Sequence, residues 1–246
     1  MKAVGIIPAR FHSTRLPGKP LIKIGNKPLI QHVYENASRS RTLTDLIVAT
    51  DDERIFAVVS KFGGKAVLTP ANLPSGTDRC AAVARNLAAQ IIANIQGDEP
   101  FLDPQLIDEA VDLLSANPEF QVVTAARDNI RQEELHNPAV VKVLINNKGE
   151  AIYFSRQNIP YVRAAEFLTK HPALVHLGLY VYRKAYLLKF VQMQPSKLEQ
   201  LEQLEQLRML ENGDRLQVLV TDRYSFGIDT SEDVQHAEKM LAKQVL

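Results

Sequence analysis

The chain has 246 residues, of which 46% are hydrophobic and 23% are charged, and its 29 Lys and Arg against 28 Asp and Glu leave a formal net charge of +1. This composition is that of an ordinary globular protein, and the near-neutral charge argues against nucleic acid as a partner, because nucleic-acid binding favours a basic excess. The single cysteine, Cys80, excludes an intramolecular disulfide and a multi-cysteine zinc site. No apolar run reaches the roughly 18 residues of a membrane span, and the first one, residues 3–7, is too short for a signal peptide. We therefore expect a soluble, cytoplasmic protein with no membrane partner.

The first half of the chain alternates strand and helix patterns. Short apolar runs predict buried strands at 4–7, 46–49, 66–68, 91–95 and 122–125. Helical patterns between them predict helices at 29–39, 53–62, 77–87 and 104–116. Asp52 and Asp103 are suited to cap two of these helices, and Pro104 suits a first helical position. This alternation predicts an α/β fold with a parallel sheet covered on both faces.

The pattern changes after about residue 125. A turn at 146–149 joins two predicted strands into a hairpin, 140–145 and 151–154. The elements expected after it are a strand at 176–182, a helix at 183–193, a helix at 197–212 ended by Gly213, a strand at 217–221, and a helix at 231–241 capped by Ser231. We interpret the chain as one domain, 1–246, with a smaller α+β lobe at approximately 126–216.

Residues 198–207 repeat the triplet Leu-Glu-Gln. In a helix each step of three residues turns the stripe by roughly −60°, so the leucines and glutamates wind across the helix surface. The three glutamates, Glu199, Glu202 and Glu205, therefore cannot all face one site.

The loop after the first strand, residues 8–20, is rich in cations. Arg10, Arg15 and Lys19 lie within ten residues that also hold Ser13 and Gly18. Open α/β sheets bind ligands at the carboxyl ends of their strands, and arginine and lysine suit a triphosphate. The loop is not a Walker A motif. The alternative is an exposed basic loop stiffened by prolines.

A carboxylate follows the strand at 91–95. Asp98 stands beside Gly97 at the predicted carboxyl edge of the sheet, where it could hold magnesium on substrate phosphates. Magnesium sites use one or two carboxylates, and Asp229 offers a second one late in the chain. Either residue could instead be a turn or capping aspartate.

For the other polar residues, the sequence either leaves a functional and a structural role equally open or favours the structural role. Ser75 or Thr77 is best explained as a helix cap, and Asp52 is preferred as a cap over a metal ligand. Strand alternation puts His176, Tyr180 and Tyr182 on one face, which could line a sugar site or be a hydrogen-bonded sheet surface. Cys80, in an apolar run, is expected to be a buried, inert thiol.

Several of these segments together resemble the 3-deoxy-manno-octulosonate cytidylyltransferase family, also called CMP-Kdo synthetase, where Kdo is the sugar acid. The resemblance rests on residues 8–20, 75–79, 96–100, 137–143, 153–160, 176–180, 205–208 and 227–230. Small departures are Asp78, Val181 and Ser231, and residues 163–172 are the least similar segment. Val181 is expected to point away from the His176 and Tyr180 face.

The resemblance implies a Rossmann-like fold of the nucleotide-diphospho-sugar transferase type, a lobe for sugar binding and dimerisation, and a homodimer. It implies CTP and Kdo as substrates, Mg²⁺ as cofactor, and a role in lipopolysaccharide synthesis. The implied nucleotide-binding residues are Pro8, Ala9, Arg10, Ser13, Arg15, Lys19, Arg79, Gln96 and Asp98. The implied sugar-binding residues are Gln96, Arg156, His176, Tyr180, Glu205 and Gln206. The implied catalytic residues are Arg15, Lys19, Asp98 and Asp229, the last two as metal ligands.

In the reaction that the resemblance implies, the anomeric hydroxyl of Kdo attacks the α-phosphorus of CTP in line and expels pyrophosphate. Three alternatives remain at this point. They are a CMP-sugar synthetase for another acid such as 8-amino-Kdo or sialic acid, a glycosyltransferase, and a catalytically silent nucleotide-binding module.

Overall fold

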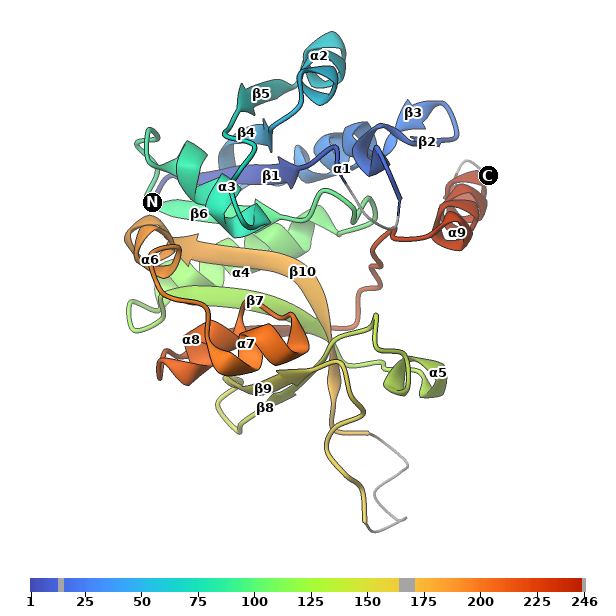
Figure 1. Ribbon diagram of the computed structural model, residues 1–246. Coiled ribbons are helices and arrows are strands. Elements are labelled where there is room, and N and C mark those ends of the chain that lie inside the picture. The colour runs from blue at the N-terminus through green and yellow to red at the C-terminus, as the bar shows by residue number, and fades with distance from the viewer. Residues whose placement is uncertain (13–15, 164–170, 245–246) are drawn as a thin grey trace.

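The described residues of this protein form one nine-stranded mixed sheet and a short two-stranded ribbon (Figure 1). The computed structural model describes residues 1–246 except 13–15, 164–170 and 245–246. The strands of the large sheet are β1 (Ala3–Ala9), β4 (Leu43–Thr50), β5 (Lys65–Leu68), β6 (Ile91–Ile95), β7 (Val122–Arg127), β8 (Lys142–Ile145), β9 (Ala151–Ser155), β10 (Leu174–Arg183) and β11 (Leu216–Thr221). The ribbon pairs β2 (Lys23–Ile24) with β3 (Lys27–Pro28).

The helices connect these strands. They are α1 (Leu29–Ala37), α2 (Glu53–Lys61), α3 (Gly76–Ala84), α4 (Pro104–Ala116), α5 (Gln132–Leu135), α6 (Lys184–Phe190), α7 (Lys197–Glu202), α8 (Leu207–Glu211) and α9 (Ser231–Gln244), with a 3₁₀ helix at Lys19–Leu21. Asp52, Ser75 and Asp103 cap α2, α3 and α4 by accepting a backbone N–H, as the sequence predicts. The ribbon, α5 and the 3₁₀ helix were not predicted, because they are too short to show a periodic pattern.

The main path of the sheet runs β11-β7-β10-β6-β1-β4-β5. All neighbouring pairs along it are parallel except those of β10, which runs antiparallel between β6 and β7. Leu179 lies opposite Ile95, and Val175 lies opposite Arg127. The beginning of β10 therefore lies at the edge of the sheet where the parallel strands β1, β4, β6 and β7 have their carboxyl ends.

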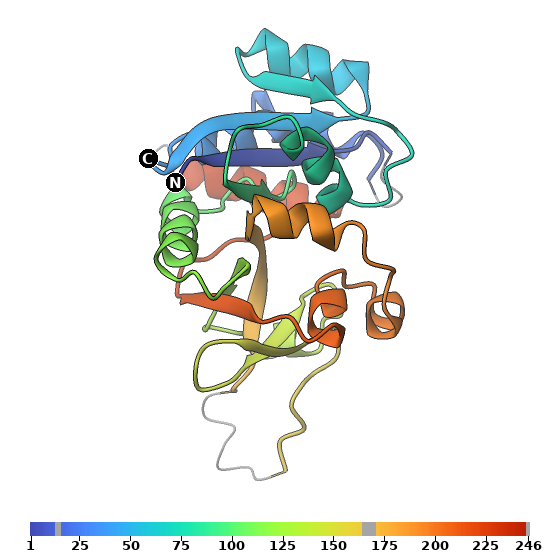
Figure 2. The same ribbon diagram turned by 90° about the vertical axis from the view of Figure 1, so that its left-hand side faces the viewer.

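Two apolar clusters cover the two faces of the sheet. One contains buried residues of α1, α2, α4 and α9, and the other contains buried residues of α3, α6 and α8. Figure 2 shows α4 on one side of the strands and α3 and α6 on the other. The predicted α/β class, a mostly parallel sheet flanked by helices, is confirmed. Among the described residues, no helix is long and apolar enough to cross a membrane.

The expected single helix at 197–212 is wrong. The chain leaves helical geometry at Gln203, which has a left-handed backbone with φ 53°, and α8 begins four residues later. The break lets Leu204 and Leu207 pack in the apolar cluster that contains α3, α6 and α8, whereas the side chain of Leu201 stays 71% exposed. Tertiary burial of two leucines thus prevails over the helix propensity of the repeat.

Ser231 is not the cap of the last helix but its first residue. Thr230 precedes it, and its Oγ1 accepts the N–H of Asp233 at 3.2 Å. The Asp233 carboxylate in return accepts the N–H groups of Asp229 and Thr230, each at 2.9 Å. This reciprocal pairing holds the segment that carries Asp229 against the start of α9.

The segment predicted as a smaller lobe, residues 126–216, contributes to the large sheet. Its hairpin β8–β9 is confirmed as antiparallel, and β8 also pairs with β10. Helices α7 and α8 lie beside this hairpin (Figure 1). The division of the chain into a domain and a lobe stays a prediction.

Candidate active site

Three charged side chains from distant parts of the chain meet at the carboxyl edge of the sheet. Lys19 Nζ lies 2.5 Å from an Asp98 carboxylate oxygen and 3.0 Å from an Asp229 carboxylate oxygen. The backbone N–H of Ile228 donates to the carbonyl of Asp98 at 2.9 Å. The structure thus brings the two predicted metal ligands within reach of a single cation. Burial disfavours the charge on Lys19, but the two carboxylates outweigh it and raise its pKa.

The pair of carboxylates fits a magnesium site. Magnesium in nucleotide enzymes takes one or two carboxylates and completes its shell with phosphate oxygens and water. Within the part of the chain that the structure describes, no cluster of three or more His, Cys, Asp or Glu could hold an ion. The ammonium of Lys19 shows that the space between Asp98 and Asp229 accepts positive charge. A metal held there would take its other ligands from phosphates and solvent.

The predicted phosphate-binding loop begins where β1 ends. A Cβ added to Gly97 would lie 2.8 Å from the carbonyl oxygen of Pro8, so the absence of a side chain lets the loop after β6 pack against the end of β1. Gly18 has φ 66°, and its N–H donates to the carbonyl of Phe11 at 3.1 Å. This bond brings Lys19 back beside the end of β1. Ser13 and Arg15 lie outside the described residues.

Arg10 and Phe11 continue this loop beyond Ala9. The guanidinium carbon of Arg54 stacks 3.4 Å over the centre of the Phe11 ring, and Arg54 also binds Asp52 through two nitrogens. Helix α2 therefore holds the loop from one side. Arg10 is half-buried at the start of this loop, close to Arg79.

His176, Tyr180 and Tyr182 share one face of β10, as predicted. The ring centres of His176 and Tyr180 are 5.3 Å apart, and those of Tyr180 and Tyr182 are 5.8 Å apart. Val181 points to the opposite cluster. Burial lowers the pKa of His176 to about 3, so its ring is neutral, and Nε2 lies 3.0 Å from the hydroxyl of Thr124.

Glu205 lies close to this face because of the break at Gln203. Its carboxylate accepts the hydroxyl of Thr77 at 2.6 Å, and Thr77 in turn lies 3.3 Å from the Asn94 amide nitrogen. Burial raises the pKa of Glu205, against the opposing hydrogen bonds from Ser75 and Thr77. The other two glutamates of the repeat point elsewhere: Glu199 pairs with Arg208, and Glu202 accepts from Ser155. The three glutamates therefore point in different directions, as expected, although the break at Gln203 separates them and not a stripe that winds across one helix.

Sequence reasoning assigned Thr77 only to capping and did not single out the side chain of Asn94. Asn94 is 1% exposed, and its Oδ1 has no hydrogen-bond partner among the described residues. Its place at the end of an otherwise apolar strand was the signal available in the sequence. Gln206, predicted beside Glu205, is buried and immediately precedes α8, while Gln96 follows β6 and is half-buried.

The guanidinium groups of Arg79 and Arg156 form hydrogen bonds within the protein, and that of Arg79 also forms an ion pair. Arg79 is fully buried, pairs with Asp51 at 3.0 Å and donates to Thr69. Arg156 donates to the backbone carbonyls of Glu202, Pro138 and Gln203 at 2.8, 3.0 and 3.3 Å, and so fastens the end of α7. Their assignments to nucleotide and sugar stay predictions. Cys80 is buried as expected, and burial raises the pKa of its thiol.

Glu99 is a residue at this site that sequence reasoning missed. Its buried carboxylate accepts the N–H of Gly178 at 2.7 Å and the hydroxyl of Ser225 at 3.0 Å. Burial, with the charge of Asp98 adding to it, raises the pKa of Glu99 to about 7. Its position next to Asp98 was the only signal in the sequence.

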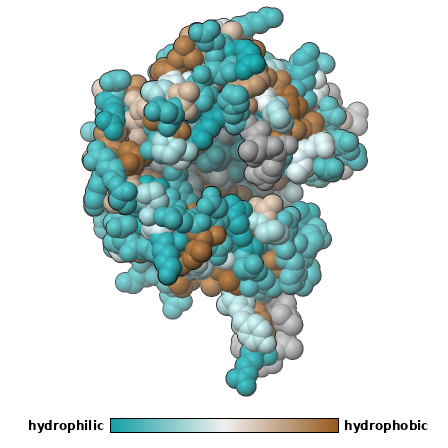
Figure 3. Space-filling view, viewed as in Figure 1, coloured by the Kyte–Doolittle hydropathy of each residue, from teal (hydrophilic) through white to brown (hydrophobic). Residues whose placement is uncertain are grey.

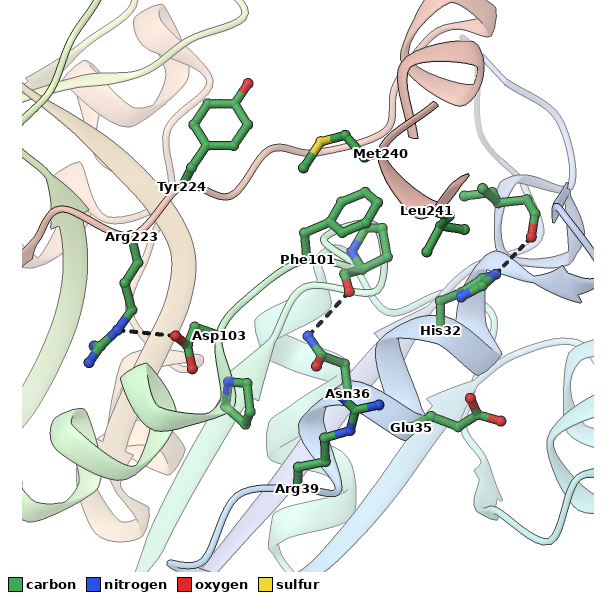
Figure 4. Close-up of a pocket in the computed structure, with 13 residues that line it drawn as sticks. His32, Glu35, Asn36, Arg39, Phe101, Asp103, Arg223, Tyr224, Met240 and Leu241 are labelled. Atoms are coloured by element: carbon green, nitrogen blue, oxygen red, sulfur yellow. Dashed lines mark hydrogen bonds and ion pairs between the residues drawn. The ribbon is translucent and has the colours of Figure 1, made fainter. Parts of the chain in front are cut away.

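The surface is hollowed on the face that carries these residues. Figure 3 shows the hollow between the part of the molecule that contains α3 and the part that contains α7 and α8, with a mainly hydrophilic rim. A separate pocket of about 470 Å³ lies between α1, the segment after Glu99 and α9 (Figure 4). Several of its polar groups are bound within the protein, for example Arg223 to Asp103 at 3.1 Å and Asn36 to the carbonyl of Pro100 at 3.2 Å. None of the predicted site residues that the structure describes lines this pocket.

A basic loop, paired aspartates and a Rossmann-like sheet define a nucleotidyltransferase, and comparison with known proteins narrows the class. A family model described as cytidylyltransferase matches residues 4–217, and the chain belongs to this family. The 3-deoxy-manno-octulosonate cytidylyltransferase of Protochlamydia amoebophila is 45% identical over 245 residues, which cover 98% of this chain and 95% of the relative. The enzyme of that name from Geobacter sulfurreducens is 44% identical over 251 residues, covering 99% of each chain.

A solved structure agrees with these relatives. CMP:2-keto-3-deoxy-manno-octonic acid synthetase complexed with CTP has a TM-score of 0.93 and 40% identity, covering 99% of this chain and 100% of that one. The family resemblance stated from sequence motifs is therefore confirmed. This chain is a cytidylyltransferase. The two relatives described above match it over nearly their full length and are named 3-deoxy-manno-octulosonate cytidylyltransferase.

Proposed function

We propose that this chain transfers CMP from CTP to the anomeric hydroxyl of 3-deoxy-D-manno-octulosonate, giving CMP-Kdo and pyrophosphate. The observation that carries the proposal is the meeting of Lys19, Asp98 and Asp229 at the sheet edge where the face of His176 and Tyr180 begins. In this proposal the phosphate-binding and sugar-binding groups are adjacent. The full-length relatives support the choice of CTP and of this sugar acid.

On the nucleotide side, the described chain supplies Arg10 and Lys19. The raised pKa of Lys19 keeps its ammonium charged at neutral pH, so it can offset negative charge on the β and γ phosphates. We propose that Asp98 and Asp229 hold Mg²⁺, which when bound supplies positive charge to the phosphate oxygens. Arg15, outside the described residues, is assigned to the same phosphates.

On the sugar side, Glu205 is held as a hydrogen-bond acceptor. Thr77 and Ser75 use part of its hydrogen-bonding capacity, which leaves other lone pairs of the carboxylate for sugar hydroxyls. The neutral ring of His176 and the hydroxyl of Tyr180 add uncharged polar groups. The anomeric hydroxyl then attacks the α-phosphorus opposite the leaving pyrophosphate, and the proposed reaction passes through no covalent enzyme intermediate.

The setting of the reaction is also a proposal. We assign the chain to the cytoplasm, as a homodimer, where its product would serve lipopolysaccharide synthesis. Sedimentation equilibrium of the purified protein measures the assembly directly, and a monomer at micromolar concentration would contradict it.

The first test is pyrophosphate release from CTP and Mg²⁺, with Kdo, 8-amino-Kdo and sialic acid offered in parallel. Release with Kdo alone supports the proposal, while release only with another acid keeps the reaction and changes the substrate. If folded protein, checked by circular dichroism, releases pyrophosphate with none of them, the proposed reaction is refuted and the nucleotide-binding module becomes the alternative to test.

A further inference from the structure

Glu99 lies where three segments of the site meet. It belongs to the turn that follows β6 and stands next to Asp98. Its carboxylate is buried, and each oxygen accepts one hydrogen bond from a neutral donor, the N–H of Gly178 or the hydroxyl of Ser225. One side chain therefore joins the turn after β6 both to β10 and to the segment before α9.

The link to β10 is close and specific. The register between β10 and β7 shifts between Leu177 and Tyr180, and Gly178 lies within this irregularity. A Cβ added to Gly178 would lie 2.3 Å from the Glu99 carboxylate and 2.4 Å from Cγ of Gln96. The Gly178 carbonyl also accepts the N–H of Gln96 at 3.2 Å. The turn after β6 is thus fastened to β10 between the two rings of His176 and Tyr180.

The link to the C-terminal segment has three contacts. Ser225 donates to Glu99, the rings of Phe101 and Phe226 stack at 5.3 Å, and Ile228 donates its N–H to the carbonyl of Asp98. Asp229 follows Ile228 directly. The position of Asp229 relative to Asp98 therefore depends on the same turn that Glu99 anchors.

We propose that Glu99 is a positioning residue that sets the two aspartates and the sugar-facing part of β10 at their working separation. The inference rests on the proposed function of the site. Partners that orient metal-binding carboxylates typically change metal affinity or activity by about 10- to 100-fold when they are removed. We expect an effect of this size from Glu99→Ala on both Mn²⁺ binding and kcat/KM for Kdo.

The variants separate positioning from general stability. In Glu99→Gln the amide oxygen can still accept from Gly178, and the amide nitrogen can donate to Ser225, so both links survive. Ser225→Ala cuts only the C-terminal link. Asp108→Ala is the matched control, because Asp108 is another buried carboxylate that joins two segments, through Ser40 and Thr42, before β4 at the opposite edge of the sheet.

Two readouts are measured on the full chain, after circular dichroism shows that each variant is folded. Mn²⁺ binding without substrates is followed by electron paramagnetic resonance, and pyrophosphate release gives kcat/KM for Kdo. Glu99→Ala should weaken Mn²⁺ binding and lower kcat/KM, Glu99→Gln should restore most of both, and Ser225→Ala should affect Mn²⁺ binding more than kcat/KM for Kdo. If Glu99→Ala does not fold, Glu99→Gln and Ser225→Ala decide the question.

The proposal is overturned by any of three results: wild-type values in Glu99→Ala, equal losses in Glu99→Ala and Glu99→Gln, or the same loss in Asp108→Ala. Failure of the wild type to bind Mn²⁺ would overturn the part that concerns the aspartates. A wild-type protein that binds Mn²⁺ but releases no pyrophosphate would refute the proposed function instead, and the Mn²⁺ series would still test Glu99.

Discussion

Replacing Lys19 with methionine removes the positive charge between two carboxylates. Breaking a buried ion pair by deleting one partner costs about 3–5 kcal/mol. The side chains of Asp98 and Asp229 are 26% and 30% exposed, so solvent screens part of the repulsion, and we expect a loss of about 2 kcal/mol in the free energy of unfolding. At this chain length the loss corresponds to a fall in Tm of about 4–8 °C.

Magnesium should reverse part of this loss. In the variant the Lys19 ammonium no longer lies between the two carboxylates, so Mg²⁺ should raise the Tm more than in the wild type, where it competes with that ammonium. The pKa of Lys19 is raised, so its contribution is fully present at pH 7 and is lost only as the pH rises through that raised value. Thermal and urea unfolding at pH 7, with and without Mg²⁺, measure the effect.

Lys27→Met is the matched control for this prediction. Lys27 pairs with Glu35 at 2.6 Å, but both side chains are exposed, and such pairs contribute about 0–1 kcal/mol. A Lys19→Met protein as stable as Lys27→Met, or equal stabilisation of variant and wild type by Mg²⁺, would show that the three charges do not form the unit described above.

Three further predictions concern the site and its supports. Asp98→Asn and Asp229→Asn should each lower kcat for pyrophosphate release by roughly 100-fold or more, because each removes charge from the proposed magnesium site; near-normal turnover in the double variant would refute the mechanism. His176 has a folded pKa of about 3 against an ordinary value of 6.5, so the unfolded state takes up its proton first and stability is lost as the pH falls from 6.5 toward 3. Between pH 7 and pH 5 this amounts to about 2 kcal/mol, and His176→Gln should lose that much less in urea unfolding; parallel pH curves would contradict it. Gln203→Gly should raise the free energy of unfolding by about 1 kcal/mol, because φ is positive there, and a loss would show that the left-handed residue is not strained.

Much of the α/β framework could be predicted because its signals are local. The strand Ile91–Ile95 and the helix Pro104–Ala116 have the predicted bounds, since buried apolar runs and capping residues act within a few positions. The hairpin of β8 and β9 is equally local. The order of the strands is not, and the insertion of an antiparallel β10 between β6 and β7 depends on contacts across the chain.

For the site, the available chemical groups could be inferred from the residues alone: cations after β1, aspartates at 98 and 229, and polar rings alternating along one strand. How these groups meet depends on the fold. Lys19 lies 79 residues before Asp98 and 210 before Asp229, and only the sheet edge brings the three within hydrogen-bond distance. Burial likewise decided the break at Gln203 and the place of Glu99 between Gly178 and Ser225, because those partners come from elements that no local pattern in the sequence connects.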